Sequence, residues 1–275
     1  MIEVWEKQYS SPINFPTLTL ANEEYNNAVK IFGKDSVSIV ERKNGTYDLM
    51  VGNPTFESEY KYILSNAKRD SEGNLLAPNG KKSNLNERQY AQVRTKEFKD
   101  WFGDWENDPE NASKVVDENG EPLVVYHGTT TPDITKFDIN KTISGRAFWF
   151  ANKEAQKAVM YSGQYDENLI LMPLFVNMKS PLLNQDDSME DYASDETHDG
   201  GLILGRLRDF KGIMSETEYK EILDNGLNDD SYLATGNVSN PNQLKSAESN
   251  IGTFSRTDDR IDYYNEEESA FGISY

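Results

Sequence analysis

The chain has 275 residues, of which 36% are hydrophobic and 11% aromatic, so it can bury a core and wholesale disorder is excluded. It contains no cysteine, which excludes disulfides, zinc–thiolate sites and thiol catalysis. A formal net charge of −19 argues against bulk attraction to nucleic acid or anionic lipid. The longest apolar run, residues 169–178, is too short to span a bilayer, and the first residues lack the features of a signal peptide. We therefore expect a cytoplasmic protein without a membrane partner.

Residues 1–68 are predicted to form a small accessory α/β-hairpin domain. Apolar residues alternate with polar ones on both sides of Asn44 and Gly45. This pattern predicts a β-hairpin with a type I′ turn, because both turn residues tolerate positive φ. The expected elements are a helix over residues 22–32, the hairpin over residues 36–51 and a second helix over residues 57–68.

Residues 69–110 are predicted to be a linker followed by an aromatic docking helix. The linker is polar and rich in turn residues, and the helix is expected over residues 87–105. The end of this helix carries four large aromatic side chains within eight residues: Phe98, Trp101, Phe102 and Trp105. So much apolar area is costly to leave in water. We favour docking on the next domain over base stacking, because the surroundings are not basic enough to hold a phosphate backbone.

Residues 111–257 are predicted to be the main domain, and residues 258–275 an acidic tail. A strand over residues 123–126 runs directly into His127. Further strands are expected over residues 148–150, 169–178, 200–204 and 231–238, and helices over residues 152–161 and 216–223. The strands over 123–126 and 148–150 are expected to face each other across a small-molecule cleft. From residue 240 onward the pattern predicts mostly loop.

His127 is one of only two histidines and lies where a strand end would present polar groups. A lone histidine in such a place is more often structural than catalytic. Gly128, however, lets a ligand approach the backbone closely, and Thr129 and Thr130 add hydroxyls. No metal site is expected, since His198 is the only other histidine and cysteine is absent. Neither a Gly-x-Ser-x-Gly elbow nor a glycine-rich phosphate loop is present, so a cleft for a flat, amide-bearing ligand remains.

Several segments, in order, resemble the ADP-ribosyltransferase superfamily, in the branch with a His–Tyr–Glu signature that contains diphtheria toxin and the poly(ADP-ribose) polymerases. The matching segments are YHGT at 126–129, GRAFWFA at 145–151, Tyr161, DGGLI at 199–203 and NPNQLKSA at 240–247. The segments at 93–105 and 250–254 resemble those that flank this domain in large polyvalent proteins of phages and mobile elements. The resemblance covers roughly residues 90–257, and residues 1–68 carry none that we can name.

The resemblance implies an α+β fold in which a split, mostly antiparallel sheet surrounds an NAD cleft. It implies that His127 hydrogen-bonds an NAD ribose, that Gly128 pairs through its backbone with the nicotinamide amide, and that Thr129 lies beside the ribose. Trp149 and Tyr161 would sandwich the nicotinamide ring, a flat cation that aromatic faces favour by about 0.5–2 kcal/mol. The implied cofactor-binding residues are His127, Gly128, Thr129, Trp149, Phe150, Tyr161 and Gln243, and the implied catalytic residues are His127, Tyr161 and Thr235.

Thr235 stands where the resemblance expects the catalytic glutamate. A threonine cannot carry the negative charge that would stabilise an oxocarbenium-like transition state. Asp229 and Asp230 lie too far along the chain to replace it by a short bulge, and Gln243 could hydrogen-bond a ribose but supplies no charge. Three interpretations remain open: weak chemistry without the acid, an inactive enzyme, or an acid from elsewhere. The candidates for that acid are Glu190, Asp191, Glu196 and the C-terminal tail.

The function implied by the resemblance is that of a toxin-like, mono-ADP-ribosylating effector of phage or mobile-element origin. Such a glycosyltransferase-class enzyme would use NAD as co-substrate and no metal. It would modify a host macromolecule, a protein rather than a nucleic acid, in the bacterial cytoplasm, and could be virion-associated before delivery. The alternative is an inactive protein of the same fold that serves as a virion-packaged or partner-binding module.

Overall fold

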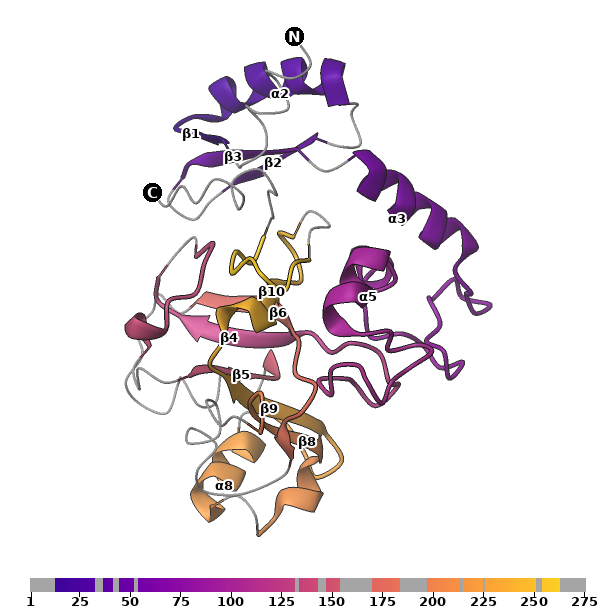
Figure 1. Cartoon of the computed structure of the whole chain (residues 1–275), viewed down its shortest axis with the longest axis vertical. Coiled ribbons are helices and arrows are strands. Elements are labelled where there is room, and N and C mark those ends of the chain that lie inside the picture. The colour runs from indigo at the N-terminus through magenta and orange to yellow at the C-terminus, as the bar shows by residue number, and fades with distance from the viewer. Residues whose placement is uncertain are drawn as a thin grey trace.

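A computed structural model of the chain describes residues 13–32, 37–41, 45–51, 54–131, 134–142, 147–153, 170–183, 197–212, 215–224, 226–250 and 254–262. Figure 1 shows a small N-terminal unit above a larger unit built around a mixed sheet. Within the described ranges, no helix is both long and apolar enough to cross a membrane.

The N-terminal unit is a three-stranded antiparallel sheet covered by one helix (Figure 1). The sheet has the order β1-β3-β2, with β1 at Ile13–Phe15, β2 at Val37–Glu41 and β3 at Tyr47–Val51. Helix α2, Leu18–Phe32, packs Ala28 against Val37 and Leu49. The hairpin predicted from the sequence therefore has a third strand, and the helix begins four residues before the predicted Asn22 cap. The turn-rich residues 1–20 predict an arm or an edge strand, and β1 is an edge strand whose partner lies more than thirty residues away in the chain.

The segment that joins the two units contains three helices. Helix α3 spans Pro54–Asn66, α4 spans Glu87–Gln92 and α5 spans Lys96–Phe102. The single helix predicted over residues 87–105 is thus two helices. The break occurs at Thr95, whose hydroxyl accepts a hydrogen bond from the Phe98 backbone N–H and caps α5. Gly103, at φ 105°, ends α5.

The larger unit is organised by a seven-stranded sheet with the order β10-β6-β4-β5-β9-β8-β7. All neighbours are antiparallel except the β7–β8 pair, which is parallel. Strand β7 and strand β10, at the two sheet edges, were not predicted. The strands are β4 (Val125–Thr129), β5 (Phe148–Ala151), β6 (Ile170–Val176), β7 (Leu182–Leu183), β8 (Gly201–Arg206), β9 (Tyr232–Val238) and β10 (Leu244–Ser246).

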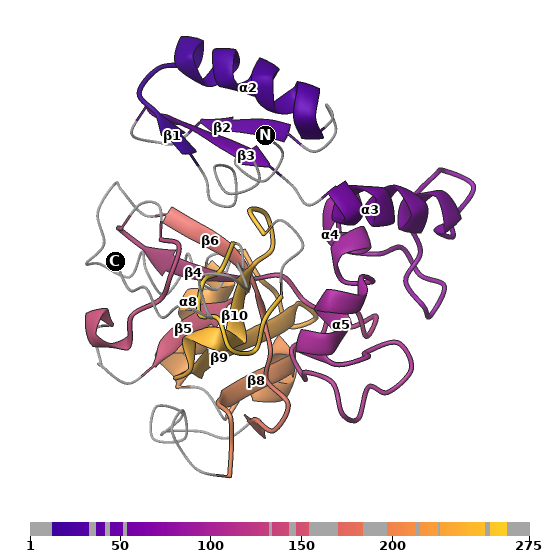
Figure 2. The ribbon, with the colours of Figure 1, turned by 45° about the horizontal axis from the view of Figure 1, so that its top comes forward.

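The remaining described helices are short. Helix α8 spans Glu216–Asp224, and single 3-10 turns lie at Ile139–Lys141, Leu207–Phe210 and Pro241–Gln243. In Figure 1, α5 lies beside the β10 and β6 edge of the sheet and α8 lies against β8 and β9. Figure 2 shows α3, α4 and α5 following one another along one side of the large unit.

One face of the large sheet packs against a single shared core that extends from β6 to β9. The other face packs against two separate clusters, one beside β6 and one beside β8 and β9. The shared core contains Val125 of β4, Phe148 of β5 and Val238 of β9. On the other face, the aromatic side chains of α5 cover Phe175 of β6, and α8 covers Ile203 of β8. The mostly antiparallel sheet agrees with the α+β class predicted for this part of the chain.

The aromatic residues of α5 dock on the sheet. The Phe98 ring meets the Phe175 ring edge-on with centroids 5.1 Å apart, and the Trp101 indole N–H donates to the Asn242 carbonyl at 3.0 Å. Phe98, Trp101 and Phe102 are each 1% exposed or less. These contacts are those of a packed core rather than of a surface for base stacking.

The predicted relation between β4 and β5 needs a correction. The two strands do not face each other across a cleft. They are neighbours in one sheet, joined by a single pair, Tyr126 with Ala151. The sequence pattern predicts both strands but carries no information about whether they pair edge to edge or pack face to face.

Residues 258–262 do not form part of an extended tail. Ile261 is 1% exposed within the shared core, its backbone N–H donates to the Thr135 carbonyl, and its carbonyl accepts from the Ser246 N–H. The charge pattern predicted a solvated acidic tail from residue 258, but the apolar Ile261 is buried among the aromatic core residues. The rest of the predicted tail lies outside the described residues.

Candidate NAD-binding site

The candidate site lies where β4 and β5 separate. Beyond the Tyr126–Ala151 pair no further ladder pair joins these strands, although β4 continues to pair with β6 as far as Thr129. The imidazole of His127 occupies the point of separation. Its Nδ1 lies 2.7 Å from the backbone carbonyl oxygen of Trp149 on β5. The histidine side chain therefore takes the place of a ladder hydrogen bond at the split.

The environment of His127 determines its protonation state. A carbonyl oxygen only accepts, so Nδ1 carries the proton and Nε2 presents a lone pair. Burial lowers the pKa of His127 below its usual value, because desolvation disfavours the cation. The ring also meets the Phe137 ring edge-on, with centroids 5.0 Å apart. His127 is thus a neutral, oriented hydrogen-bond acceptor, and no described residue hydrogen-bonds to its Nε2.

Gly128 and Thr129 form the end of β4 that pairs with β6 but no longer with β5. They pair with Leu171 and Ile170 of β6, and all four residues are half-buried. The Thr129 hydroxyl oxygen accepts a hydrogen bond from the Thr131 N–H at 3.1 Å, which turns the chain away from the sheet. The backbone of Gly128 therefore lies one residue beyond His127 on the strand that bounds the split.

Trp149 and Phe150 point to opposite faces of the sheet. Trp149 is 36% exposed, whereas Phe150 is 1% exposed in the shared core, with its ring over Gly236. Strand alternation from the Tyr126–Ala151 pair places the Trp149 ring on the face of Tyr126 and the His127 ring on the core face. The Trp149 backbone, rather than its ring, is what His127 contacts, and Phe150 acts here as a core residue.

Thr235 lies in the middle of β9, in line with the start of the split. It pairs with Ala151 on one side and Ile203 on the other, and its hydroxyl donates to the Phe150 carbonyl at 3.3 Å. Two strand spacings separate β9 from β4, which corresponds to about 10 Å. Thr235 therefore lies two strands away from β4, and strand alternation places its side chain on the face opposite the His127 ring.

The acids nearest to Thr235 in the sequence serve other roles. Asp229 accepts a hydrogen bond from the Tyr219 hydroxyl at 2.6 Å, and Asp230 pairs with Arg208. Both precede β9 and lie beyond the Arg206–Tyr232 end of its ladder with β8. Four residues of the predicted site lie outside the described residues: Tyr161, Glu190, Asp191 and Glu196.

Gln243 lies at the opposite end of the sheet from His127. Its side-chain amide donates to the carbonyls of Asn177 at 3.0 Å and Asp199 at 2.7 Å. Asn177 follows β6 five residues after Met172, the residue that pairs with His127, which corresponds to about 16 Å along the strand. Gln243 thus ties the start of β10 to neighbouring loops and does not meet the other predicted site residues.

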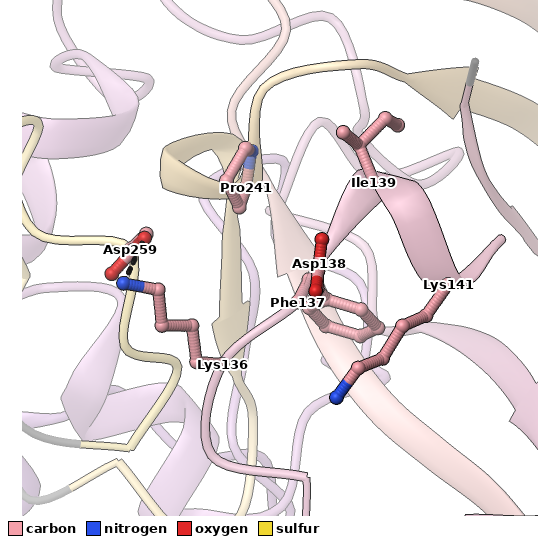
Figure 3. Close-up of a pocket in the computed structure, with 7 residues that line it drawn as sticks. All are labelled: Lys136, Phe137, Asp138, Ile139, Lys141, Pro241 and Asp259. Carbon is pink, nitrogen blue, oxygen red and sulfur yellow. Dashed lines mark ion pairs between the residues drawn. The ribbon is translucent and has the colours of Figure 1, made fainter. Parts of the chain in front are cut away.

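A pocket of about 410 Å³ lies beside the split rather than in it (Figure 3). Phe137, whose ring contacts His127, also lines this pocket. Figure 3 shows the Lys136 ammonium turned toward Asp259, with which it forms an ion pair at 2.6 Å. The lining residues are Lys136, Phe137, Asp138, Ile139, Lys141, Pro241 and Asp259. Among the described parts of the chain, no group of three or more His, Cys, Asp or Glu side chains could hold a metal ion.

One polar residue of this region, Asn237, was not singled out from the sequence. It is two residues from Thr235 on β9, pairs with Trp149, and is fully buried. No motif marks it, since asparagine in a strand is unusual but carries no chemical signature of its own. Its position two residues after Thr235 was the only available signal.

The large, mostly antiparallel sheet is consistent with a protein of the ADP-ribosyltransferase class. The chain matches the family described as ADP-ribosyltransferase in polyvalent proteins over residues 117–254, which is half of its length. The chain belongs to this family, as the sequence motifs predicted. No curated protein and no solved structure matches it.

Proposed function

We propose that the protein transfers ADP-ribose from NAD to a host macromolecule and releases nicotinamide. In this reaction the bond between the ribose C1′ and the nicotinamide nitrogen breaks, the acceptor forms a bond to C1′, and the acceptor loses a proton. Proteins of the ADP-ribosyltransferase class use NAD as co-substrate, and the chain belongs to such a family. A single transfer per acceptor, a protein acceptor, and an origin in a phage or mobile element are part of the proposal.

The observation that carries the proposal is the state of His127. Its imidazole is neutral, its Nδ1 proton is engaged by the Trp149 carbonyl, and its Nε2 lone pair is directed away from that bond. A ribose hydroxyl is a donor that such an acceptor can orient. His127 is half-buried and its Nε2 is not among the buried, unpaired polar atoms, so this lone pair is accessible to a ligand.

The test is NAD binding, followed by turnover. We expect NAD to raise the melting temperature of the wild type, and His127→Ala to abolish this shift. His127→Gln is the matched control for polarity, because it retains an acceptor without the imidazole geometry. Nicotinamide release from labelled NAD, and label transfer to a bacterial lysate, then measure catalysis. A folded wild type with no NAD-dependent shift would contradict the proposal.

A second function is favoured by Thr235. Its hydroxyl is committed to the Phe150 carbonyl, and no charge is present at the position that the resemblance assigns to the catalytic acid. The chain would then be an inactive module that binds a partner or is packaged in a virion, rather than an enzyme acting in the host cytoplasm. This alternative predicts a stable complex with another protein and no nicotinamide release.

The two functions are separated by Thr235→Glu. If the protein binds NAD productively and lacks only the acid, the added carboxylate should accelerate nicotinamide release on the order of 10²-fold, the contribution typical of one electrostatic stabiliser. Thr235→Gln, of equal size but uncharged, should not accelerate it. Equal release by wild type and Thr235→Glu, both shown to bind NAD, would mean that the position is not catalytic.

A further inference from the structure

The C-terminal segment, residues 258–262, connects one edge of the large sheet to the loop that follows β4. On the sheet side, the Ile261 carbonyl accepts a hydrogen bond from the Ser246 N–H of β10 at 2.8 Å. On the loop side, the Ile261 N–H donates to the Thr135 carbonyl at 2.9 Å. The segment therefore lies between β10 and this loop and holds the two together through its backbone.

The same junction carries an ion pair. The Lys136 ammonium lies 2.6 Å from the Asp259 carboxylate, and Figure 3 shows the two side chains turned toward each other. The backbones of Lys136 and Arg260 form an isolated antiparallel bridge. The side chains of Lys136 and Asp259 are 59% and 29% exposed, so the pair can be changed without opening the core.

The next residue of the loop reaches the candidate site. Phe137 is buried, and its ring meets the His127 imidazole edge-on with centroids 5.0 Å apart. The Trp149 carbonyl fixes only the Nδ1 atom of that imidazole, and a single hydrogen bond leaves the tilt of the ring open. An edge-on aromatic contact supplies a second point of attachment. The direction of the Nε2 lone pair therefore depends on where the loop holds Phe137.

Direct binding of an anionic ligand by Lys136 is the competing explanation for its position. The 410 Å³ pocket is lined by the ammonium groups of Lys136 and Lys141 and by the carboxylates of Asp138 and Asp259. Lys136 is paired with Asp259, and Lys141 interacts electrostatically with Asp138. The lining therefore has no excess of positive charge that would attract an anion. Its charges favour the contact between the loop and the C-terminal segment.

We propose that the C-terminal segment positions His127 for NAD binding, and that Asp259 acts on the imidazole through the loop that carries Phe137. The inference rests on the proposed function, in which His127 orients the ribose of NAD. Asp259 contacts no substrate and is a positioning residue. The NAD site of this chain thus depends on a segment beyond residue 254, where the family match ends.

The test is a charge-swap cycle in the full chain. Lys136→Asp and Asp259→Lys each place like charges side by side, so each should release the loop and weaken NAD binding, measured by calorimetry, about fivefold. The double variant restores an opposite-charge pair and should bind NAD within about twofold of the wild type. Lys141→Asp is the matched control. It changes the charge of the same pocket, but among the described residues Lys141 makes no hydrogen bond or ion pair with the C-terminal segment, so NAD binding should stay unchanged.

A second measurement does not require NAD. The titration of His127, followed by NMR and assigned with His127→Gln, reports how well the imidazole is shielded from water. In each single variant the measured pKa should rise toward the usual value of 6.5, because a displaced Phe137 lets water reach the ring. In the double variant and in Lys141→Asp the measured pKa should equal that of the wild type. If Asp259→Lys fails to fold, Asp259→Asn replaces it, since this variant removes the charge without adding repulsion.

The outcomes separate this inference from the proposed function. If the wild type binds no NAD, the proposed function falls, and the His127 titration alone decides whether the segment positions the imidazole. If NAD binding and the His127 pKa are the same in both single variants as in the wild type, only the inference falls. A loss that the double variant does not recover would mean that Lys136 or Asp259 contacts the ligand directly. An equal loss in Lys141→Asp would assign the effect to the charge of the pocket, and either result overturns the inference.

Discussion

At the scale of single residues, the state of His127 depends on two neighbours that are distant in the chain. The Trp149 carbonyl fixes the tautomer, and the Phe137 ring contributes to the burial that keeps the imidazole neutral. The motif around His127 predicts a polar group at a strand end. It does not predict which ring nitrogen is available, since that follows from the strand that lies beside β4.

The lowered pKa of His127 predicts a dependence of stability on pH. The unfolded chain takes up a proton near the usual pKa of 6.5, and the folded chain does so only at lower pH. As the pH falls below about 6.5, the unfolded state therefore binds more protons than the folded state, and the free energy of unfolding decreases. Above that pH, His127 does not change the free energy of unfolding as the pH varies. Urea denaturation at pH 7.5 and 5.5 measures the effect.

The control for this prediction is His127→Gln, which cannot titrate in that range. Relative to it, the wild type should lose stability between pH 7.5 and 5.5, and its NAD-dependent thermal shift should weaken as Nε2 becomes protonated. Parallel pH profiles of the two proteins would show that the folded and unfolded pKa values of His127 do not differ.

At the scale of elements, the junction of α4 and α5 is held by Arg94. Its guanidinium stacks over the Tyr90 ring at 3.4 Å and pairs with Glu121 at 2.7 Å and Glu106 at 3.3 Å. Glu121 is completely buried and also accepts from the Ser83 hydroxyl at 2.5 Å. This cluster joins the aromatic segment to the turn that precedes β4.

Arg94→Met should destabilise the protein strongly. The substitution leaves the buried Glu121 carboxylate without its cation, and breaking a buried pair in this way costs about 3–5 kcal/mol. The exposed Lys96–Asp100 pair is the matched control, since Lys96→Met should cost less than about 1 kcal/mol. Chemical denaturation of both variants measures the difference, and similar losses would contradict a central role for Arg94.

Prediction at this scale succeeded where the signal is local. The strands around β4, β5, β6, β8 and β9 follow from apolar runs in the sequence, and α8 follows from its helical pattern. Strands β7 and β10 are three residues or shorter, so their pattern is too brief to detect. The single helix predicted over residues 87–105 failed because the side chain of Thr95 competes for backbone bonds and starts a new helix.

At the scale of the whole molecule, a buried lysine holds the C-terminal described segment to the sheet edge. Lys245 of β10 is 1% exposed, and its ammonium donates to the carbonyls of Asp258 and Arg260. Burial lowers the pKa of Lys245 to about 8, because desolvation outweighs the nearby carboxylates of Asp258 and Asp259. The segment around Ile261 is thereby fixed beside the shared core.

The lowered pKa of Lys245 predicts that the protein becomes more stable as the pH rises above 8. Between pH 8 and the usual lysine value of 10.5, the unfolded chain keeps a proton on Lys245 that the folded chain has released. The contribution of Lys245 to the free energy of unfolding should therefore increase across that window, by a total on the order of 3 kcal/mol, and be flat below it. Lys245→Met removes this titration, so the difference between wild type and variant, measured by urea denaturation from pH 7 to 10, should change only above pH 8.

The sequence by itself determined the family, the strand that carries His127, and the absence of a glutamate at position 235. These three conclusions depend only on residue types and on their spacing along the chain, which are the same in the folded and the unfolded protein. Only the tertiary structure decided that β4 and β5 are neighbours, that Gln243 lies at the far end of the sheet, and that Asn237 is buried beside Trp149. Such relations arise from strand pairing between residues far apart in the chain, where the energy lies in burial and register rather than in local preference.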